Sequence, residues 1–205
     1  MMGTGKPEGM GGADLAATVA RAQSGDRDAW GELYRQFAAP LFRFCRRVLH
    51  TREDAEDAAM DIMVKLQGKL GQYDPARPFS AWLYRVATNH CWDLLRRRKV
   101  RQDLETEDAT ELPLEHPDPG QLDRVISQQT GSGVRAALER LPDRARLALV
   151  LRYYADMNYD EIAEALGVRR AFVGVVLLRA RHALREALTE GAGNPQATAR
   201  AGGGR

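Results

Sequence analysis

The chain has 205 residues, of which 28% are charged and 44% are hydrophobic, and its formal net charge is +2 at pH 7. This composition is typical of a globular protein and excludes a chain that is disordered throughout. No apolar run approaches the roughly 18 residues needed to span a bilayer, and the N-terminus lacks the apolar core of a signal peptide. With only Cys45 and Cys91 there is no disulfide framework, so we expect a cytoplasmic protein that does not insert into a membrane.

The small net charge conceals three blocks of opposite sign. Residues 77–101 are strongly basic, residues 102–123 contain many acids and no Lys or Arg, and residues 169–185 are basic with no acid. Phosphate binding depends on the local density of positive charge rather than on the sum over the chain. The two basic blocks are therefore candidate phosphate-binding segments.

Helical spacing of apolar residues dominates the N-terminal half. Residues 1–12 are rich in Gly and are expected to be disordered, after which apolar residues recur at helical spacing through residues 15–49. A helix is then expected at 52–70, with Thr51 as its N-cap and with acids early and Lys late, as the helix dipole favours.

A loop containing Gly and two prolines is expected at residues 71–78, and a long helix at 79–98. Residues 102–130 are acidic, contain prolines and have no sustained period, which indicates a flexible linker.

Four more helices are expected after the linker, at residues 134–141, 144–154, 159–166 and 170–188. Asn158 with Glu161 resembles a capping box at the start of the third helix, and Gly167 is a natural residue to follow its end. The chain is thus predicted to be all-α, with two small helical domains joined by the acidic linker. The expected bounds are a tail at 1–12, domains at 13–101 and 131–190, the linker at 102–130 and a tail at 191–205.

Residues 159–168 have the pattern of a helix-turn-helix. Such a motif needs a small residue where its helices touch, a glycine in the turn and an apolar turn residue, here Ala163, Gly167 and Val168. Any compact helical hairpin can show the same pattern, so the motif alone leaves both interpretations open.

The segment from 78 to 101 interleaves aromatic and basic residues. Trp82, Tyr84 and Trp92 alternate with Arg85, Asn89 and the basic cluster 96–99. Aromatic rings stack on unpaired bases and basic side chains follow the phosphate backbone in proteins that bind single strands. The alternative is that Trp82 is a core residue and the arginines are a solvated helix end.

Several of these segments resemble bacterial sigma factors of the extracytoplasmic-function type. The resemblance is carried by DAED at 54–57, FSAWLYRVATNHCWDLLRRR at 79–98, LPDRARLALVLRYYADMNYDEIAEALGV at 141–168 and RARHALREAL at 179–188. It extends over roughly residues 13–190. The resemblance implies a protein that binds core RNA polymerase, directs it to promoter DNA and promotes melting, with two domains called regions 2 and 4.

The resemblance also implies roles for individual residues. The residues implied to contact the clamp helices of the polymerase β′ subunit are Asp54, Glu56, Asp57 and Asp61. Those implied to bind minus-ten DNA, in part through a pocket for a flipped base, are Tyr73, Ser80, Trp82, Arg85, Asn89, Arg96, Arg97 and Arg98. Those implied to bind minus-thirty-five DNA are Arg169, Arg170, Arg179, Arg181 and Arg185. Met60 stands where the family often has Gln and Met63 where it often has Phe, so the polymerase contact is expected to be repacked.

The helix at 170–188 departs from the family pattern in its first turns. Its core face is expected to be Val173, Leu177, Ala180, Leu184 and Leu188. Gly174 and Val175 stand where polar residues are usual and cannot hydrogen-bond to base edges. One account is a weak sequence preference based on phosphate contacts, which we favour. The other is a protein partner, such as an anti-sigma factor or the polymerase β flap, on Phe172, Val175 and Leu178.

Catalysis is not expected. The four His residues have no metal-ligand spacing, and the chain has neither a glycine-rich phosphate loop nor a nucleophile motif, so no metal and no cofactor is expected. An alternative function is a helix-turn-helix regulator that binds sigma factors or other proteins without initiating transcription. Such a regulator should lack the combination of Trp82, Asn89 and Arg98, which is present here.

Overall fold

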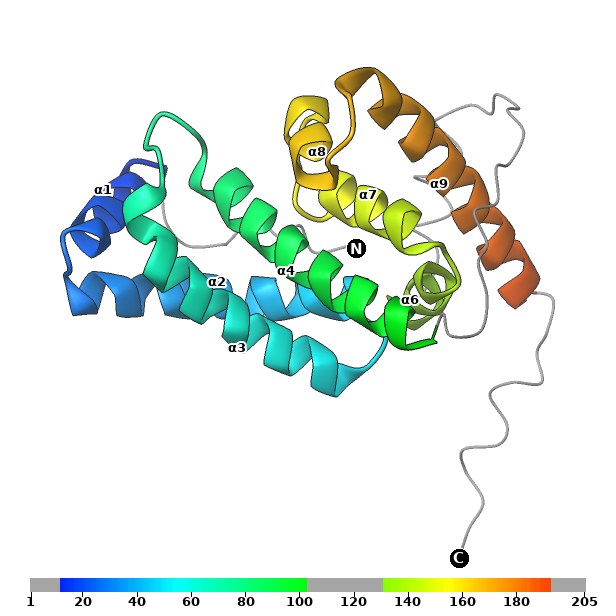
Figure 1. The fold of residues 1–205 in the computed structure, drawn as a ribbon, viewed down its shortest axis with the longest axis horizontal. Helices are drawn as coiled ribbons and strands as arrows, with labels where there is room; N and C mark the ends of the chain where they lie inside the picture. The colour runs from blue at the N-terminus through cyan, green and yellow to red at the C-terminus, as the bar shows by residue number, and fades with distance from the viewer. Residues whose placement is uncertain (1–11, 103–130, 193–205) are drawn as a thin grey trace, which may run out of the picture.

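The computed structural model describes residues 12–102 and 131–192, and every regular element within these two ranges is helical. This confirms the all-α prediction for the described part of the chain (Figure 1). The tails and the acidic linker that the sequence predicts fall almost wholly on residues 1–11, 103–130 and 193–205, which lie outside the described residues.

The first group of helices forms a bundle around one apolar core. Its elements are α1 (Gly12–Gln23), α2 (Arg27–Val48), α3 (Arg52–Lys69), the short 3-10 helix η1 (Leu70–Gln72) and α4 (Phe79–Gln102). Helix α2 packs against α1, α3 and α4, so its apolar face is covered from three directions. The most deeply buried side chains include Leu33, Phe37, Leu41, Phe44, Ile62, Leu66 and Leu83.

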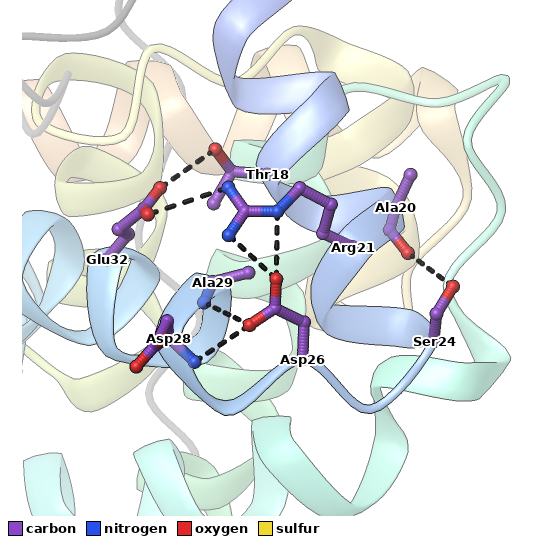
Figure 2. A network of polar contacts seen from close by, with 8 residues as sticks. All are labelled: Thr18, Ala20, Arg21, Ser24, Asp26, Asp28, Ala29 and Glu32. Atoms are coloured by element: carbon purple, nitrogen blue, oxygen red, sulfur yellow. Dashed lines mark hydrogen bonds and ion pairs between the residues drawn. The ribbon is translucent and has the colours of Figure 1, made fainter.

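Helices α1 and α2 meet at a corner that is held by polar contacts (Figure 2). Asp26 caps α2 by accepting hydrogen bonds from the backbone N–H groups of Asp28 and Ala29, and Arg21 Nε donates to the same carboxylate at 2.9 Å. Gly25 turns the chain with a positive φ of 91°, a conformation that glycine adopts at no steric cost. The apolar period across residues 15–49 is therefore divided between two helices.

Local signals place the ends of α3 and α4. Thr51 caps α3, as predicted, and its hydroxyl accepts from the N–H of Asp54 at 3.0 Å. Helix α4 runs four residues beyond its expected end at Arg98. The extension, residues 99–102, contains Lys, Arg and Gln, which have good helix propensity, and no Gly or Pro to stop the helix.

The second group consists of α6 (Gly131–Glu139), α7 (Asp143–Tyr153), α8 (Tyr159–Leu166) and α9 (Arg170–Ala192). The capping box of Asn158 and Glu161 is present, and Gly167 ends α8 in the left-handed conformation with φ 63°. Helix α9 packs on α6, α7 and α8, and the expected core residues Val173, Leu177, Ala180, Leu184 and Leu188 are all buried. Helices α8 and α9 thus form the predicted helix-turn-helix.

The two groups are in direct contact: α4 packs on α2 and α3 and also against α7 and α8, and α2 itself contacts α6 and α7 (Figure 1). Tyr154, which follows α7, is 1% exposed and enters the first group. Its hydroxyl donates to Pro40 O at 2.7 Å and accepts from Arg43 Nε at 3.3 Å, and the guanidinium carbon of Arg47 lies 4.3 Å from the ring centre. The sequence predicts only a tether between two domains that lie apart, and it does not predict this direct contact.

The core of the first group can be tested within a single helix. Ile62 is fully buried in α3, whereas Val64, two residues later, is 70% exposed. We expect Ile62→Ala to lower the free energy of unfolding by about 2–5 kcal/mol, because it leaves a cavity, and Val64→Ala to change it by less than about 0.5 kcal/mol. Urea unfolding followed by circular dichroism measures both, and equal effects would contradict the packing described.

Candidate nucleic-acid interface

A cavity of about 470 Å³ lies beside the loop between η1 and α4. Four of the residues that the sequence assigned to minus-ten DNA binding line it together: Tyr73, Trp82, Arg85 and Asn89. Lys69 and Gln72 add polar groups to the same wall, as does Asp74. The structure therefore brings aromatic, basic and amide side chains from two sequence segments into one concave surface.

The loop that forms this surface is tied down at both ends. The Tyr73 hydroxyl donates to Arg77 O at 2.6 Å, and the Asp74 carboxylate accepts from the N–H of Ala76 at 2.9 Å. Gln23, at the end of α1, donates from its amide nitrogen to Leu70 O and Tyr73 O, each at 3.0 Å. Sequence reasoning missed Gln23, because nothing in its local pattern connects it with a loop 50 residues away.

Trp82 is the accessible member of an aromatic cluster. Its ring centre lies 5.4 Å from that of Tyr73 and 5.6 Å from that of Phe79, while Tyr73 and Phe79 meet edge to face at 5.3 Å. Both partners are buried, whereas Trp82 is half-buried and faces the cavity. Packing on one side thus holds the indole in place and leaves it available for stacking on the other.

Two of the other aromatic residues do not line this cavity. Tyr84 is 1% exposed and lies in the core, where its ring contacts Phe44 at 5.2 Å and Tyr154 at 6.2 Å, so the expectation that it takes part in stacking on bases is wrong for this structure. Burial raises the pKa of the Tyr84 phenol well above its usual value. Trp92 lies beneath the guanidinium of Arg144 from α7 at 5.7 Å. Ser80 is half-buried and is not among the residues that line the cavity.

The basic cluster Arg96, Arg97 and Arg98 is exposed near the far end of α4. With a rise of about 1.5 Å per residue, these arginines lie roughly 10–14 Å along the helix from Asn89. Arg98 Nη1 lies 3.7 Å from Asp54 Oδ2 on α3. This ion pair joins the surface assigned to DNA phosphates to the surface assigned to polymerase.

The acidic residues predicted to contact polymerase, Asp54, Glu56, Asp57 and Asp61, are all exposed on α3. Two large apolar side chains lie among them at helical spacing, since Met60 is 67% and Val64 is 70% exposed. Sequence reasoning treated Met60 as a departure from the family and passed over Val64. Neither residue fits the spacing of the buried face of α3, and this mismatch in the sequence could have identified both as surface residues.

His90 connects α4 to this face of α3. Its Nδ1 accepts a hydrogen bond from Lys65 Nζ at 2.5 Å, and its Nε2 lies 3.6 Å from Asp61 Oδ2. Burial, followed by the nearby Lys65 charge, lowers the pKa of His90 below its ordinary value. The imidazole is therefore neutral at pH 7 and adds no charge to the surface.

The five arginines predicted for the minus-thirty-five element differ in their surroundings. Arg169, Arg170 and Arg179 are exposed. Arg170 Nε pairs with Asp160 at 2.7 Å, and the Arg169 guanidinium lies 4.8 Å from the ring centre of Phe172. Arg181 and Arg185 are half-buried, and Arg181 Nε donates to the Tyr153 hydroxyl at 2.8 Å. Arg181 is therefore tied to α7.

Phe172 is an exposed large apolar residue in the first turn of α9, at 48%, while Val175 and Leu178 are half-buried. Gly174 faces Tyr159 of α8, and an added Cβ would lie 3.8 Å from that ring, in ordinary van der Waals contact. The glycine is therefore not required by a close approach of the two helices.

Within residues 12–102 and 131–192, no helix is both long enough and apolar enough to cross a membrane. Nor do the His, Cys, Asp and Glu side chains of these ranges gather into a group of three or more that could hold a metal ion.

Comparison with protein families gives two matches, to Sigma-70 region 2 over residues 33–101 and to Sigma-70, region 4 over residues 133–184. Among named relatives, the ECF RNA polymerase sigma factor SigM of Mycobacterium tuberculosis is 34% identical over 167 residues, which are 82% of this chain and 79% of that protein. SigE of Mycolicibacterium smegmatis is 33% identical over 171 residues, 82% of this chain but 65% of that longer protein.

Solved structures show the same similarity. CnrH, determined in complex with the cytosolic domain of CnrY, is 28% identical with a TM-score of 0.59, over 85% of this chain and 97% of that one. The sigma factor RpoE of Bartonella quintana, solved with the anti-sigma factor NepR, shares the fold at 20% identity and a TM-score of 0.60, over 78% of this chain and 96% of that one.

Proposed function

The chain belongs to the ECF sigma factors of the sigma-70 family, and from that membership we propose that it binds core RNA polymerase, directs it to promoters and helps to open the DNA. It acts without catalytic groups, cofactor or metal. The proposed domains are 13–101, corresponding to region 2, and 131–190, corresponding to region 4. A factor with these partners works where polymerase and promoter DNA are, in the cytoplasm.

The observation that carries the proposal is the cavity shared by Tyr73, Trp82, Arg85 and Asn89. It lies in the domain that matches region 2, where a base flipped from the minus-ten element is proposed to bind. Flipping a base costs a few kcal/mol. Stacking on Trp82, worth about 1–3 kcal/mol, and hydrogen bonds from Asn89 to the base edge offset that cost. Arg85 binds an adjoining phosphate, and Arg96, Arg97 and Arg98 bind phosphates further along α4.

The outer face of α3 is proposed to contact the clamp helices of the polymerase β′ subunit. Met60 and Val64 supply apolar area to bury, and Asp54, Glu56, Asp57 and Asp61 supply the charges that orient the encounter. Exposed apolar side chains that cluster at helical spacing are typical of a protein interface. The apolar part explains how the contact forms although Met60 departs from the usual residue.

Region 4 is proposed to dock at the minus-thirty-five element mainly through phosphates. Arg169 and Arg170 are exposed at the start of α9 and Arg179 is exposed further along it, while Gly174 and Val175 offer no hydrogen bonds to base edges. An anti-sigma factor is proposed as a further partner, and the complex of the relative CnrH with a cytosolic protein domain supports a partner of this kind. The β flap of the polymerase is proposed to contact region 4 as well.

The proposal predicts transcription that depends on core polymerase. The purified protein alone should bind duplex DNA weakly, because its two DNA-binding surfaces are aligned only on the polymerase. Addition of core enzyme should give transcripts from specific members of a promoter library. Failure of the protein to co-purify with core polymerase, together with an absence of transcripts, would show that the chain is instead a regulator without initiating activity.

Melting should depend on the region 2 cavity. Trp82→Ala and Asn89→Ala are expected to reduce open-complex formation by at least about fivefold, because each removes about 1 kcal/mol or more of contact with an unpaired base. Permanganate reactivity of thymines near the start site measures melting, and co-purification measures polymerase binding, which should be retained. Asp93→Ala, one turn further along α4 and outside the cavity, is the control. Normal melting by folded Trp82 and Asn89 variants would show that these side chains do not bind the unpaired base.

The unusual start of α9 can be tested by restoring polar groups. Gly174→Arg combined with Val175→Ser should sharpen the minus-thirty-five preference by about 5-fold to 150-fold, the value of a good bidentate contact at about 1–3 kcal/mol. Promoter selection with the holoenzyme measures this preference. Thr189→Arg, which adds the same charge at the far end of α9, should leave the preference unchanged. Strict base specificity in the unmodified protein would contradict phosphate-based docking. Loss of a bound protein partner with unchanged promoter choice would assign the face to that partner.

A further inference from the structure

A second cavity, of about 300 Å³, lies between the two helical groups and next to the first. Arg77, Trp82 and Arg85 line it from the region 2 side. Polar residues at the start of α8 and along it line the other side: Asn158, Asp160, Glu161 and Glu164. Glu164 lines both cavities, so it stands at the place where the candidate base pocket opens toward region 4.

The carboxylate of Glu164 bridges two arginines of region 2. Its Oε2 lies 3.3 Å from Arg77 Nη1, and its Oε1 forms an ion pair with Arg85 Nη1. Each oxygen thus serves one guanidinium. All three side chains are about half exposed, with relative accessibilities of 62% for Arg77, 43% for Arg85 and 42% for Glu164, so water and ions reach the contact.

A phosphodiester group has the same recognition chemistry as this carboxylate. Each presents two terminal oxygens that share one negative charge and accept charge-assisted hydrogen bonds from guanidinium groups. Arg77 and Arg85 both line the cavity that Trp82 and Asn89 also line. A DNA strand whose base enters that cavity places a phosphate near the same two guanidinium groups.

We propose that Glu164 of region 4 is an intramolecular competitor for the Arg77–Arg85 pair, and that a phosphate of the unpaired minus-ten strand displaces it. This inference rests on the proposed function, because it concerns regulation of the same site. In the closed form α8 covers one side of the base pocket and occupies its cations. In the form that binds DNA, region 4 moves away and the two arginines pair with the strand.

Displacement of Glu164 itself costs little, because ion pairs that are exposed on this scale contribute little free energy. Separation of the domains also exposes Tyr154, which is 1% exposed in the closed form, and the free energy of polymerase binding offsets that cost. The apparent affinity of the free protein for a strand is reduced by the fraction of molecules that are open. Closure therefore lowers binding of the free sigma factor to single strands without altering the binding surface itself.

The experiment measures binding of a fluorescent single-stranded minus-ten oligonucleotide to the free full-length protein. Glu164→Gln keeps the shape of the side chain and removes its charge, and it should bind the oligonucleotide about threefold to tenfold more tightly than the unmodified protein. The matched control is Asp160→Asn. Asp160 lines the same cavity but pairs with Arg170, so its substitution removes the same charge and should leave binding within about twofold. Equal affinities for the Glu164 variant and the unmodified protein, or an equal gain in both variants, overturn the proposal.

Domain separation gives a second measurement. Spin labels on cysteines introduced at Gln67 of α3 and Thr189 of α9, both exposed, report the distance between the domains, while Cys45 and Cys91 are fully buried and do not label in the folded protein. The oligonucleotide should lengthen this distance in the unmodified protein, and Glu164→Gln should lower the oligonucleotide concentration at which the distance lengthens. A distance that stays the same when the oligonucleotide is bound overturns the proposal.

Transcription with core polymerase separates the two hypotheses. If the holoenzyme initiates at promoters and all variants bind the oligonucleotide equally, only the competitor role of Glu164 is wrong. If no variant binds the oligonucleotide and the holoenzyme initiates nowhere, the proposed function fails and the competitor role fails with it.

Discussion

Burial of the Tyr154 phenol ties the two halves of this protein together. Tyr154 is almost fully removed from solvent, and a buried hydroxyl without a hydrogen-bond partner costs about 1–3 kcal/mol. Its partners are not in its own domain but in α2, where Pro40 O accepts its proton and Arg43 donates to its oxygen. Burial raises the pKa of Tyr154, so the phenol remains protonated and keeps its donor. The ring position is further fixed by Arg47 above it and Tyr84 beside it.

The arrangement around Tyr154 sets the position of everything that follows it in region 4. With α7 held against α2, α8 lies on the first half of α4 and brings Glu164 to Arg77 and Arg85 (Figure 1). Helix α9 packs on α6, α7 and α8 instead. One domain contact therefore covers the candidate minus-ten pocket while it leaves the exposed start of α9 accessible.

Region 2 carries two chemically different surfaces on adjacent helices. The face of α3 proposed to contact polymerase is acidic with an apolar strip, and the face of α4 proposed to bind DNA is aromatic and basic. They meet at the Asp54–Arg98 ion pair, where opposite charges of the two faces lie 3.7 Å apart, and at neutral His90 of α4, which contacts Lys65 and lies 3.6 Å from Asp61 on α3. The surfaces proposed for polymerase and for DNA are therefore in direct contact through side chains of α3 and α4.

The sequence by itself determined the features that depend on residues a few positions apart. Thr51 and Asn158 mark helix starts, Gly167 marks a helix end, and the spacing of Val173, Leu177 and Ala180 marks the buried face of α9, because caps and helix faces are made by neighbours in the chain. The resemblance to sigma factors added Tyr73, Trp82, Arg85 and Asn89 as one site, and the structure places them around one cavity.

Only the tertiary structure decided which side chains of these helices are accessible and what they contact. Tyr84 and Trp82 lie two residues apart in a similar local pattern, yet one is core and the other faces the cavity, because α2 and the residue after α7 cover only the former. Tyr154 and Pro40 are separated by 114 residues, and Arg77 and Glu164 by 87. No period or local motif encodes pairs at such separations. They arise from the shapes and unsatisfied polar groups of surfaces that exist only after each bundle has folded.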